Sequence, residues 1–166
     1  ARRDFLKLAM AAGMSFTAAQ GLWSRQTRGE PKKGGILRAG LAHGSTTDVL
    51  DPATYENGFT QTIGNSVNNR LTDVAPSGEL VGELAESWEP SADAKTWRFK
   101  LRSGVQFHNG KSFGSDDVIA SINHHRGDAS TSGAKGIVGE IADLKADGKD
   151  SVIVSLKGGN ADFPFI

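Results

Sequence analysis

Strict alternation of apolar and basic side chains at residues 96–102 constrains the fold of this chain more than any other feature. Trp97, Phe99 and Leu101 are each followed by a basic residue. Successive side chains of a strand point to opposite faces of a sheet, so the pattern predicts a strand with one buried face and one solvated face. The rest of the chain must therefore supply a second strand and an apolar cover.

A turn is expected soon after this strand. Asn109-Gly110 lies between apolar residues, and this dipeptide readily takes the positive φ angles of a tight hairpin turn. Gly110-Lys111-Ser112 also matches the second half of a nucleotide-binding loop. However, five residues separate Gly104 from Gly110, and that loop needs four. A hairpin turn is the better interpretation.

A helix is expected to begin at Ser115. This side chain can accept a backbone N–H at a helix start, and the two aspartates that follow it would meet the positive end of the helix dipole. Val118, Ile119 and Ile122 would form the buried stripe, and Gly127 would end the helix.

The remaining segments predict a mixture of helices and strands. Residues 36–41 are typical of a short strand, and residues 61–71 have apolar side chains at the four-residue spacing of an amphipathic helix. The same spacing recurs over residues 80–88, where a glycine and a following proline limit any helix to a turn or two. Residues 137–145 and 151–156 are expected to form a second strand pair.

Composition excludes several classes of partner and site. Nineteen basic and nineteen acidic side chains leave no net charge, so electrostatics does not favour nucleic acid or an anionic membrane surface. The absence of cysteine excludes disulfides, thiolate metal sites, iron–sulfur clusters and an acylated lipoprotein cysteine. Glycine accounts for 21 of the 166 residues, so many turns are expected.

The first 33 residues have the features of an export signal. Two arginines precede an uncharged stretch at residues 8–24, which is too short and too weakly apolar for a confident membrane span. We therefore expect a twin-arginine signal and linker at residues 1–33, with cleavage near residues 17–19, and a solute-binding part at residues 34–166. The alternative is an amphipathic helix of the folded domain. The signal motif consists of Arg2, Arg3, Phe5, Leu6 and Lys7.

No catalytic residue, metal site or cofactor is expected. The histidines are His43, His108, His124 and His125. Adjacent helical residues point about 100° apart, so the last two do not readily face one ion. No Gly-x-Ser-x-Gly nucleophile elbow is present.

Tyr55 is the aromatic residue best placed to contact a ligand. It lies in the loop at residues 51–58, between an expected strand and an expected helix, where open α/β sheets place their ligand clefts. Trp97, in contrast, lies on the buried face of its strand, so core packing is expected there.

The order of the motifs after the linker is more specific than any one of them. They occupy residues 34–41, 50–52, 69–72, 78–80, 84–89, 96–118, 141–143, 152–156 and 163–165. This succession resembles the bacterial extracellular solute-binding proteins of family 5, the peptide- and nickel-type receptors of ABC importers. The resemblance covers essentially everything after the linker.

The resemblance implies a type II periplasmic-binding-protein-like fold of mixed α/β class. The chain would hold only its N-terminal part, with the start of the first lobe and much of a small extra domain. The apolar cluster at residues 163–166 also predicts truncation. In this family two lobes close around the solute by hinge motion. The loop that the resemblance places nearest the cleft carries Tyr55, Glu56 and Asn57.

The implied function is capture of a peptide or similar small solute in the periplasm and its delivery to the permease subunits of an ABC importer. The twin-arginine translocon would be a partner during export. One alternative is an exported cofactor-dependent oxidoreductase subunit, against which the lack of cysteine and of a dinucleotide fingerprint counts. Another is an exported structural or partner-binding domain. The solute is not predicted, because peptides, nickel chelates, sugars and opines share this scaffold.

Overall fold

The computed structural model describes residues 2–17 and 34–166, which divide into units at residues 1–40 and 41–166. In the first unit, α1 (Arg2–Ala11) is followed by a turn at Gly13, where φ is 85°. No helix within the described ranges is long and apolar enough to cross a membrane. Most of the expected cleavage region (residues 17–19) and most of the linker lie outside the described residues.

The second unit is built on a four-stranded antiparallel sheet with the order β3-β4-β6-β5. Its strands are β3 (Ala85–Pro90), β4 (Thr96–Leu101), β5 (Ile141–Ala146) and β6 (Ser151–Leu156). The prediction for residues 96–102 is confirmed, because Trp97, Phe99 and Leu101 are only 4%, 2% and 1% exposed. The predicted second strand pair is also confirmed, although β5 begins at Ile141, after the short helix α5 (Lys135–Val138).

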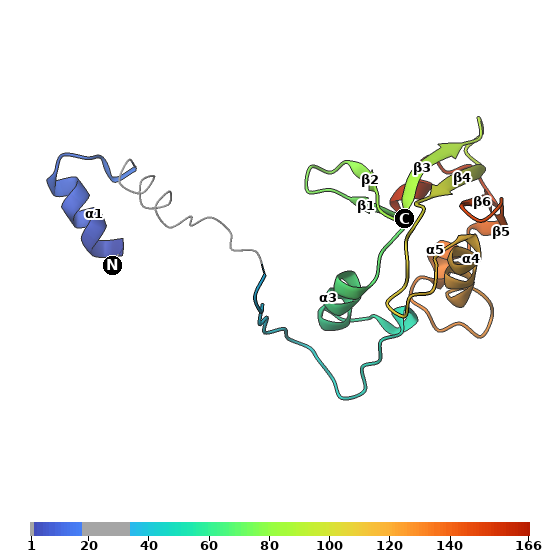
Figure 1. The fold of residues 1–166 in the computed structure, drawn as a ribbon, viewed down its shortest axis with the longest axis horizontal. Helices are drawn as coiled ribbons and strands as arrows, with labels where there is room; N and C mark the ends of the chain where they lie inside the picture. The colour runs from blue at the N-terminus through green and yellow to red at the C-terminus, as the bar shows by residue number, and fades with distance from the viewer. Residues whose placement is uncertain (1, 18–33) are drawn as a thin grey trace. The chain divides into compact units, whose positions relative to one another are not determined.

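Helix α4 (Ser115–His124) packs against the inner face of this sheet, over β5 and β6 (Figure 1). Val118 is buried in the core, and the two isoleucines of the predicted stripe pack around it. The prediction that Ser115 caps the helix is wrong. Gly114 is the N-cap, and its N–H donates to the Asp117 carboxylate at 3.1 Å. The Ser115 hydroxyl instead donates to the Gly148 carbonyl at 2.8 Å, which ties the helix to the turn between β5 and β6.

The predicted turn at Asn109-Gly110 is confirmed. The Gly110 N–H donates to the Phe107 carbonyl, and Phe107 N–H donates to the carbonyl of Lys111. Only the glycine of the pair takes a positive φ, of 84°. The chain runs back on itself through this turn before α4 begins, so the segment is not a nucleotide-binding loop.

Residues 80–88 form strands, so the prediction of at most a short helix there is wrong. Strand β2 (Leu80–Gly82) pairs with β1 (Thr72–Val74), and the edge strand β3 pairs with β4. A four-residue spacing places side chains on one face of a helix and also on one face of a strand, so the pattern cannot separate the two. These residues are strands because β1 and β4 are available as hydrogen-bonding neighbours.

Two further elements differ from expectation. Residues 36–41 form no strand, and Ile36 and Leu37 are 86% and 92% exposed. A strand needs a hydrogen-bonding neighbour, and no strand in the described part of the chain pairs with this segment. The helix expected at 61–71 is α3 (Gly58–Val67), which begins earlier and ends before Leu71.

The end of the chain packs back onto the sheet. Phe163, in the short 3-10 helix η2 (Phe163–Phe165), lies against the rings of Trp97 and Phe99, with centroids 6.5 and 6.2 Å away. The Thr72 hydroxyl donates to the Pro164 carbonyl at 2.6 Å, so the C-terminal end lies beside β1 (Figure 1).

Candidate functional site

Two capped turns hold Tyr55 in place. Asp51 precedes the 3-10 helix η1 (Pro52–Thr54), and its carboxylate accepts the Ala53 N–H at 3.0 Å. Asn57 is the N-cap of α3, and its side-chain oxygen accepts the N–H groups of Phe59 and Thr60, both at 3.0 Å. Asx side chains favour these positions because they satisfy N–H groups that lack a helical partner.

The ring of Tyr55 lies directly against the backbone of α3 at Gly64. A Cβ atom at position 64 would lie 2.3 Å from Cε2 of Tyr55, so only glycine admits the ring in this position. The Tyr55 hydroxyl is buried and has no hydrogen-bond partner among the described residues. A buried hydroxyl without a partner costs about 1–3 kcal/mol, so this atom calls for an explanation.

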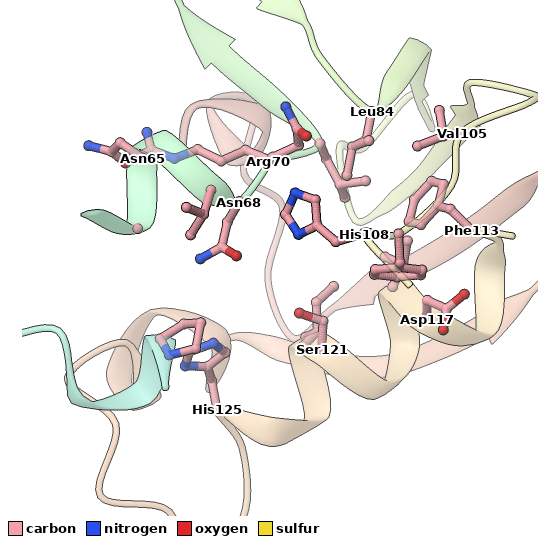
Figure 2. A pocket seen from close by; sticks show the side chains of 18 of the residues that line it. Asn65, Asn68, Arg70, Leu84, Val105, His108, Phe113, Asp117, Ser121 and His125 are labelled. Atoms are coloured by element: carbon pink, nitrogen blue, oxygen red, sulfur yellow. Dashed lines mark hydrogen bonds between the residues drawn. The ribbon is translucent and has the colours of Figure 1, made fainter. Parts of the chain in front are cut away.

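Tyr55 lines a cavity of about 590 Å³. This volume falls in the range of about 300–1,000 Å³ that is usual for small-molecule sites. In Figure 2, the His108 imidazole extends into the space between Asn68 and Arg70 on one side and Ser121 and His125 on the other. The lining residues are Pro52, Tyr55, Gln61, Gly64, Asn65, Val67, Asn68, Asn69, Arg70, Leu71, Leu84, Val105, Gln106, Phe107, His108, Phe113, Asp117, Val118, Ser121, Ile122 and His125.

Carboxamides are the most numerous polar side chains in the lining of this cavity. Arg70 donates to the side-chain oxygen of Asn65 at 2.5 Å and lies 3.6 Å from the Asp73 carboxylate. The lining contains one carboxylate, that of Asp117. It is already engaged by the Lys111 ammonium and by the N–H of residue 114. The cavity therefore presents a guanidinium, imidazoles and carboxamides, but no free carboxylate.

Two histidines at the end of α4 connect this helix to neighbouring loops. The His124 Nε2 lies 2.8 Å from the Asp51 carboxylate, and the His125 Nδ1 lies 2.7 Å from the Ser132 hydroxyl. The hydrogen bond from the Ala53 N–H lowers the pKa of Asp51, and the bond to His124 lowers it further. Burial lowers the pKa of His125. The described residues contain no group of three or more side chains suited to a metal ion.

The three residues expected to contact ligand occupy different environments. Tyr55 lines the cavity, Asn57 caps α3, and Glu56 is exposed and outside the lining. Sequence reasoning missed Arg70 and His108, which the fold brings to the same space from separate segments. No local pattern marks them, since His108 stands in a turn and Arg70 follows a helix.

Comparison with known proteins identifies the family of this chain. Residues 79–166 match the family model of the bacterial extracellular solute-binding proteins, family 5 Middle. The di/tripeptide-binding protein 2 of Pseudomonas aeruginosa is 38% identical over 81 residues, which are 44% of this chain and 15% of that protein. A probable peptide ABC transporter periplasmic-binding protein of Sinorhizobium fredii is 28% identical over 156 residues, covering 94% of this chain and 28% of the relative. The chain thus spans less than a third of these relatives.

Solved structures show the same fold. The agropinic acid complex of AgaA from A. tumefaciens R10 has a TM-score of 0.66 at 25% identity, over 69% of this chain and 23% of that one. The mannopinic acid complex of MoaA from the same source has a TM-score of 0.65 at 28% identity, over 70% and 24% of the two chains. The expected mixed α/β, periplasmic-binding-protein fold is therefore confirmed.

Proposed function

This chain belongs to the bacterial extracellular solute-binding proteins of family 5, and we propose that it is part of the periplasmic solute-binding component of an ABC importer. The observation that carries the proposal is the family match over residues 79–166, the segment that contains β2, the four-stranded sheet and α4. Relatives bear names of peptide-, glutathione- and nickel-binding proteins. Membership of a binding family favours a receptor over an exported oxidoreductase subunit.

The proposed role is binding without chemistry. The full protein would bind a peptide or similar small solute, and its closed form would be recognised by the membrane permease. Such closure requires tighter binding to the closed state than to the open one. The residues 34–166 would supply one wall of the site.

We assign ligand contacts to the loop that carries Tyr55, Glu56 and Asn57. The ring of Tyr55 already lines the cavity. The Asn57 side-chain oxygen is occupied by the start of α3, and its amide nitrogen donates to the Asp48 carboxylate at 3.5 Å, so one N–H of that amide is left for a ligand. Glu56 is exposed and would meet solute only on closure.

The experiment that tests this function is native mass spectrometry of the full-length protein purified from its exporting host. A receptor should retain a small molecule that is lost on mild unfolding. A deletion strain should lose uptake of that molecule, and the wild-type gene should restore it. A protein that retains nothing, or uptake that does not change, would contradict the proposal. A bound redox cofactor with turnover would support the oxidoreductase instead.

We also propose that the protein is exported by the twin-arginine route. The supporting residues all lie on α1 and are Arg2, Arg3, Phe5, Leu6 and Lys7. Replacing Arg2 and Arg3 with lysine should leave the protein in the cytoplasm, while the same replacement at Arg25 and Arg28, outside the motif, should not. Cell fractionation gives the readout. Periplasmic protein in the double variant would exclude this route.

A further inference from the structure

We propose that Asn109 is a site of spontaneous covalent modification, at which the chain cyclises to a succinimide and then opens to aspartate or isoaspartate. The chain contains two Asn-Gly dipeptides, Asn57-Gly58 and Asn109-Gly110. Both have the chemistry for this reaction, because glycine has no Cβ atom to hinder the approach of its backbone nitrogen. The fold protects the first dipeptide and leaves the second open, so the two should react at different rates.

The reaction joins the side chain of Asn109 to the next peptide nitrogen. The Gly110 nitrogen attacks Cγ of Asn109, a carbon–nitrogen bond forms, and the Cγ–Nδ2 bond breaks. The proton of the Gly110 amide leaves with Nδ2 as ammonia. Water then opens the ring: attack at Cγ gives aspartate, and attack at the main-chain carbonyl carbon of residue 109 gives isoaspartate. Each product carries a new carboxylate, and water is the co-reactant.

The turn around Asn109 holds the reacting groups weakly. Residues 106–112 are all exposed. The Asn109 side-chain oxygen accepts one hydrogen bond, from the Lys111 N–H at 3.0 Å. The Gly110 N–H, which must be released before it can react, donates to the Phe107 carbonyl at 2.8 Å. Water can replace both partners in an exposed turn, so a local opening frees the nucleophile and the carboxamide together.

The start of α3 holds Asn57 more firmly. Its side-chain oxygen accepts two N–H groups of this helix, and its amide nitrogen donates to the Asp48 carboxylate at 3.5 Å. Its main-chain carbonyl accepts the Gln61 N–H at 3.0 Å. Cyclisation would require Cγ to turn toward the Gly58 nitrogen, which breaks the cap and loosens the first turn of the helix. The fold therefore slows the reaction at Asn57.

Modification of Asn109 would reach the cavity. Its neighbours Phe107 and His108 line this space, and the His108 imidazole extends into it (Figure 2). Isoaspartate adds one methylene group to the main chain, inside a turn that is closed by a hydrogen bond from the Phe107 N–H to the Lys111 carbonyl at 2.8 Å. That bond must lengthen or break, so the lining at residues 107 and 108 should rearrange. Aspartate adds a charge without lengthening the chain and should leave the turn closed.

The test ages the full-length protein at mildly alkaline pH. Peptide mapping by mass spectrometry measures conversion at both asparagines, and an isoaspartate-specific methyltransferase labels the isoaspartate. In the folded protein, Asn109 should convert at least about tenfold faster than Asn57, because the cap of α3 adds hydrogen bonds that must break first. In denaturing urea the two should convert at similar rates, because glycine follows each of them.

Two variants provide matched controls. Asn109→Gln keeps a carboxamide but would have to close a six-membered ring, so labelling at this position should disappear. Asn123→Gln makes the same change at an exposed asparagine that histidine follows, and it should leave labelling at Asn109 unchanged. The isoaspartate fraction, separated by anion exchange, should show faster hydrogen exchange at the Phe107 amide than the unaged protein. Asn109→Asp, which carries the charge alone, should exchange like wild type.

Several results would overturn this assignment. They are equal rates at the two asparagines in the folded protein, a rate ratio that urea does not reduce, and the absence of isoaspartate at Asn109. Unchanged exchange at the Phe107 amide in the isoaspartate fraction, or equally fast exchange in Asn109→Asp, would overturn the proposed effect on the cavity lining.

Discussion

The sheet with α4 and the segment around α3 are stabilised by different interactions. The sheet region contains a cluster of nine buried hydrophobic residues, seven of which lie on β4, β5 and β6. The buried residues of α3, in contrast, are Thr60 and Gly64, neither of which has a large apolar side chain. Caps made by Asp51 and Asn57 order that segment instead. Apolar burial thus stabilises the four-stranded sheet with α4, which we call the platform. Local hydrogen bonds position residues 51–67, which carry Tyr55 and which we call the wall.

Substitutions in the platform should therefore change mainly the stability of the protein, whereas substitutions in the wall should change mainly the geometry of the cavity. A platform of buried side chains resists substitution at its exposed positions and fails when its core is truncated. A wall held by caps and one close ring contact should respond to small changes in local geometry. Five substitutions test the contrast, in descending order of expected effect.

Phe99→Ala should have the largest effect. This ring is 2% exposed and contacts Trp97 and Phe163, so truncation should lower the free energy of unfolding by about 3–5 kcal/mol. Urea denaturation followed by tryptophan fluorescence measures it. Phe165→Ala is the matched control, because that ring is 53% exposed and should change stability by no more than about 0.5 kcal/mol. Equal losses would remove the distinction between core and surface.

Gly64→Ala should disturb the wall more than the platform. The new methyl group would overlap the Tyr55 ring, at a cost of about 1–3 kcal/mol. The better helix propensity of alanine offsets about 1 kcal/mol of this. The NMR resonances of the Tyr55 ring should also shift, because the ring must move away from the new methyl group. Gly58→Ala lies on the same helix with no atom within 4 Å of the added Cβ. It should leave both the resonance and the stability close to wild type, and a matching loss in Gly58→Ala would contradict the role of the ring.

Asn57→Ala should loosen the start of α3. Loss of an N-cap costs about 1 kcal/mol, and hydrogen exchange at the Phe59 and Thr60 amides should quicken accordingly. Asn57→Asp keeps an acceptor oxygen and should preserve slow exchange. Unchanged exchange in the alanine variant would show that packing, and not the cap, orders this helix.

Ala94→Gly should strengthen the platform slightly. Ala94 lies in the turn between β3 and β4 with a φ of 51°, a region that costs a residue with a Cβ atom about 1–2 kcal/mol. The greater chain entropy of glycine offsets about 0.5–1 kcal/mol, so a gain of about 0.5 kcal/mol is expected. Ala92→Gly, in the same turn without a positive φ, should instead reduce stability. A gain in both variants would count against backbone strain at Ala94.

His125 should give the smallest effect, visible only through pH. Burial lowers the pKa of this side chain in the folded protein below its value when unfolded, so the unfolded state binds the proton first as pH falls. The contribution of neutral His125 is therefore present above about pH 6.5 and is lost as pH falls below it. Tm measured across this range should drop less steeply in His125→Gln. Parallel curves would exclude His125 as the titrating group.

The platform could be predicted from the sequence better than the wall. Alternation at residues 96–102 identified the buried face of β4, because strict alternation of apolar and polar side chains fits a strand and does not fit a helix. The spacing of Leu80, Leu84 and Trp88 fits a helix and a strand equally, so β2 and β3 were not predicted. Ser115 has the chemistry of a cap, but its hydroxyl is taken by a carbonyl 33 residues away in sequence. No local rule foresees such a partner.

The cavity could not be predicted for the same reason. Tyr55 was identified from its loop, but Arg70, His108 and Gly64 acquire meaning only when α3, α4 and the turn at residues 107–111 are placed together. Tyr55 and Gly64 are nine residues apart in sequence. Tyr55 follows η1, whereas Gly64 lies in α3, so no pattern within one element links them. A sequence pattern indicates which face of one helix or strand is buried, whereas this cavity is lined by residues from several separate elements.

The hydrogen bond from Thr72 to the Pro164 carbonyl has a practical consequence. It places the first strand of the hairpin beside the last turn of the chain, so the 93 residues from Thr72 to Pro164 enter and leave at neighbouring points. A segment with adjacent ends can be transplanted with little distortion of its host. Exchanging this block between related receptors would therefore need only two splice points a few ångströms apart, and such chimaeras could assign solute preference to the block or to its surroundings.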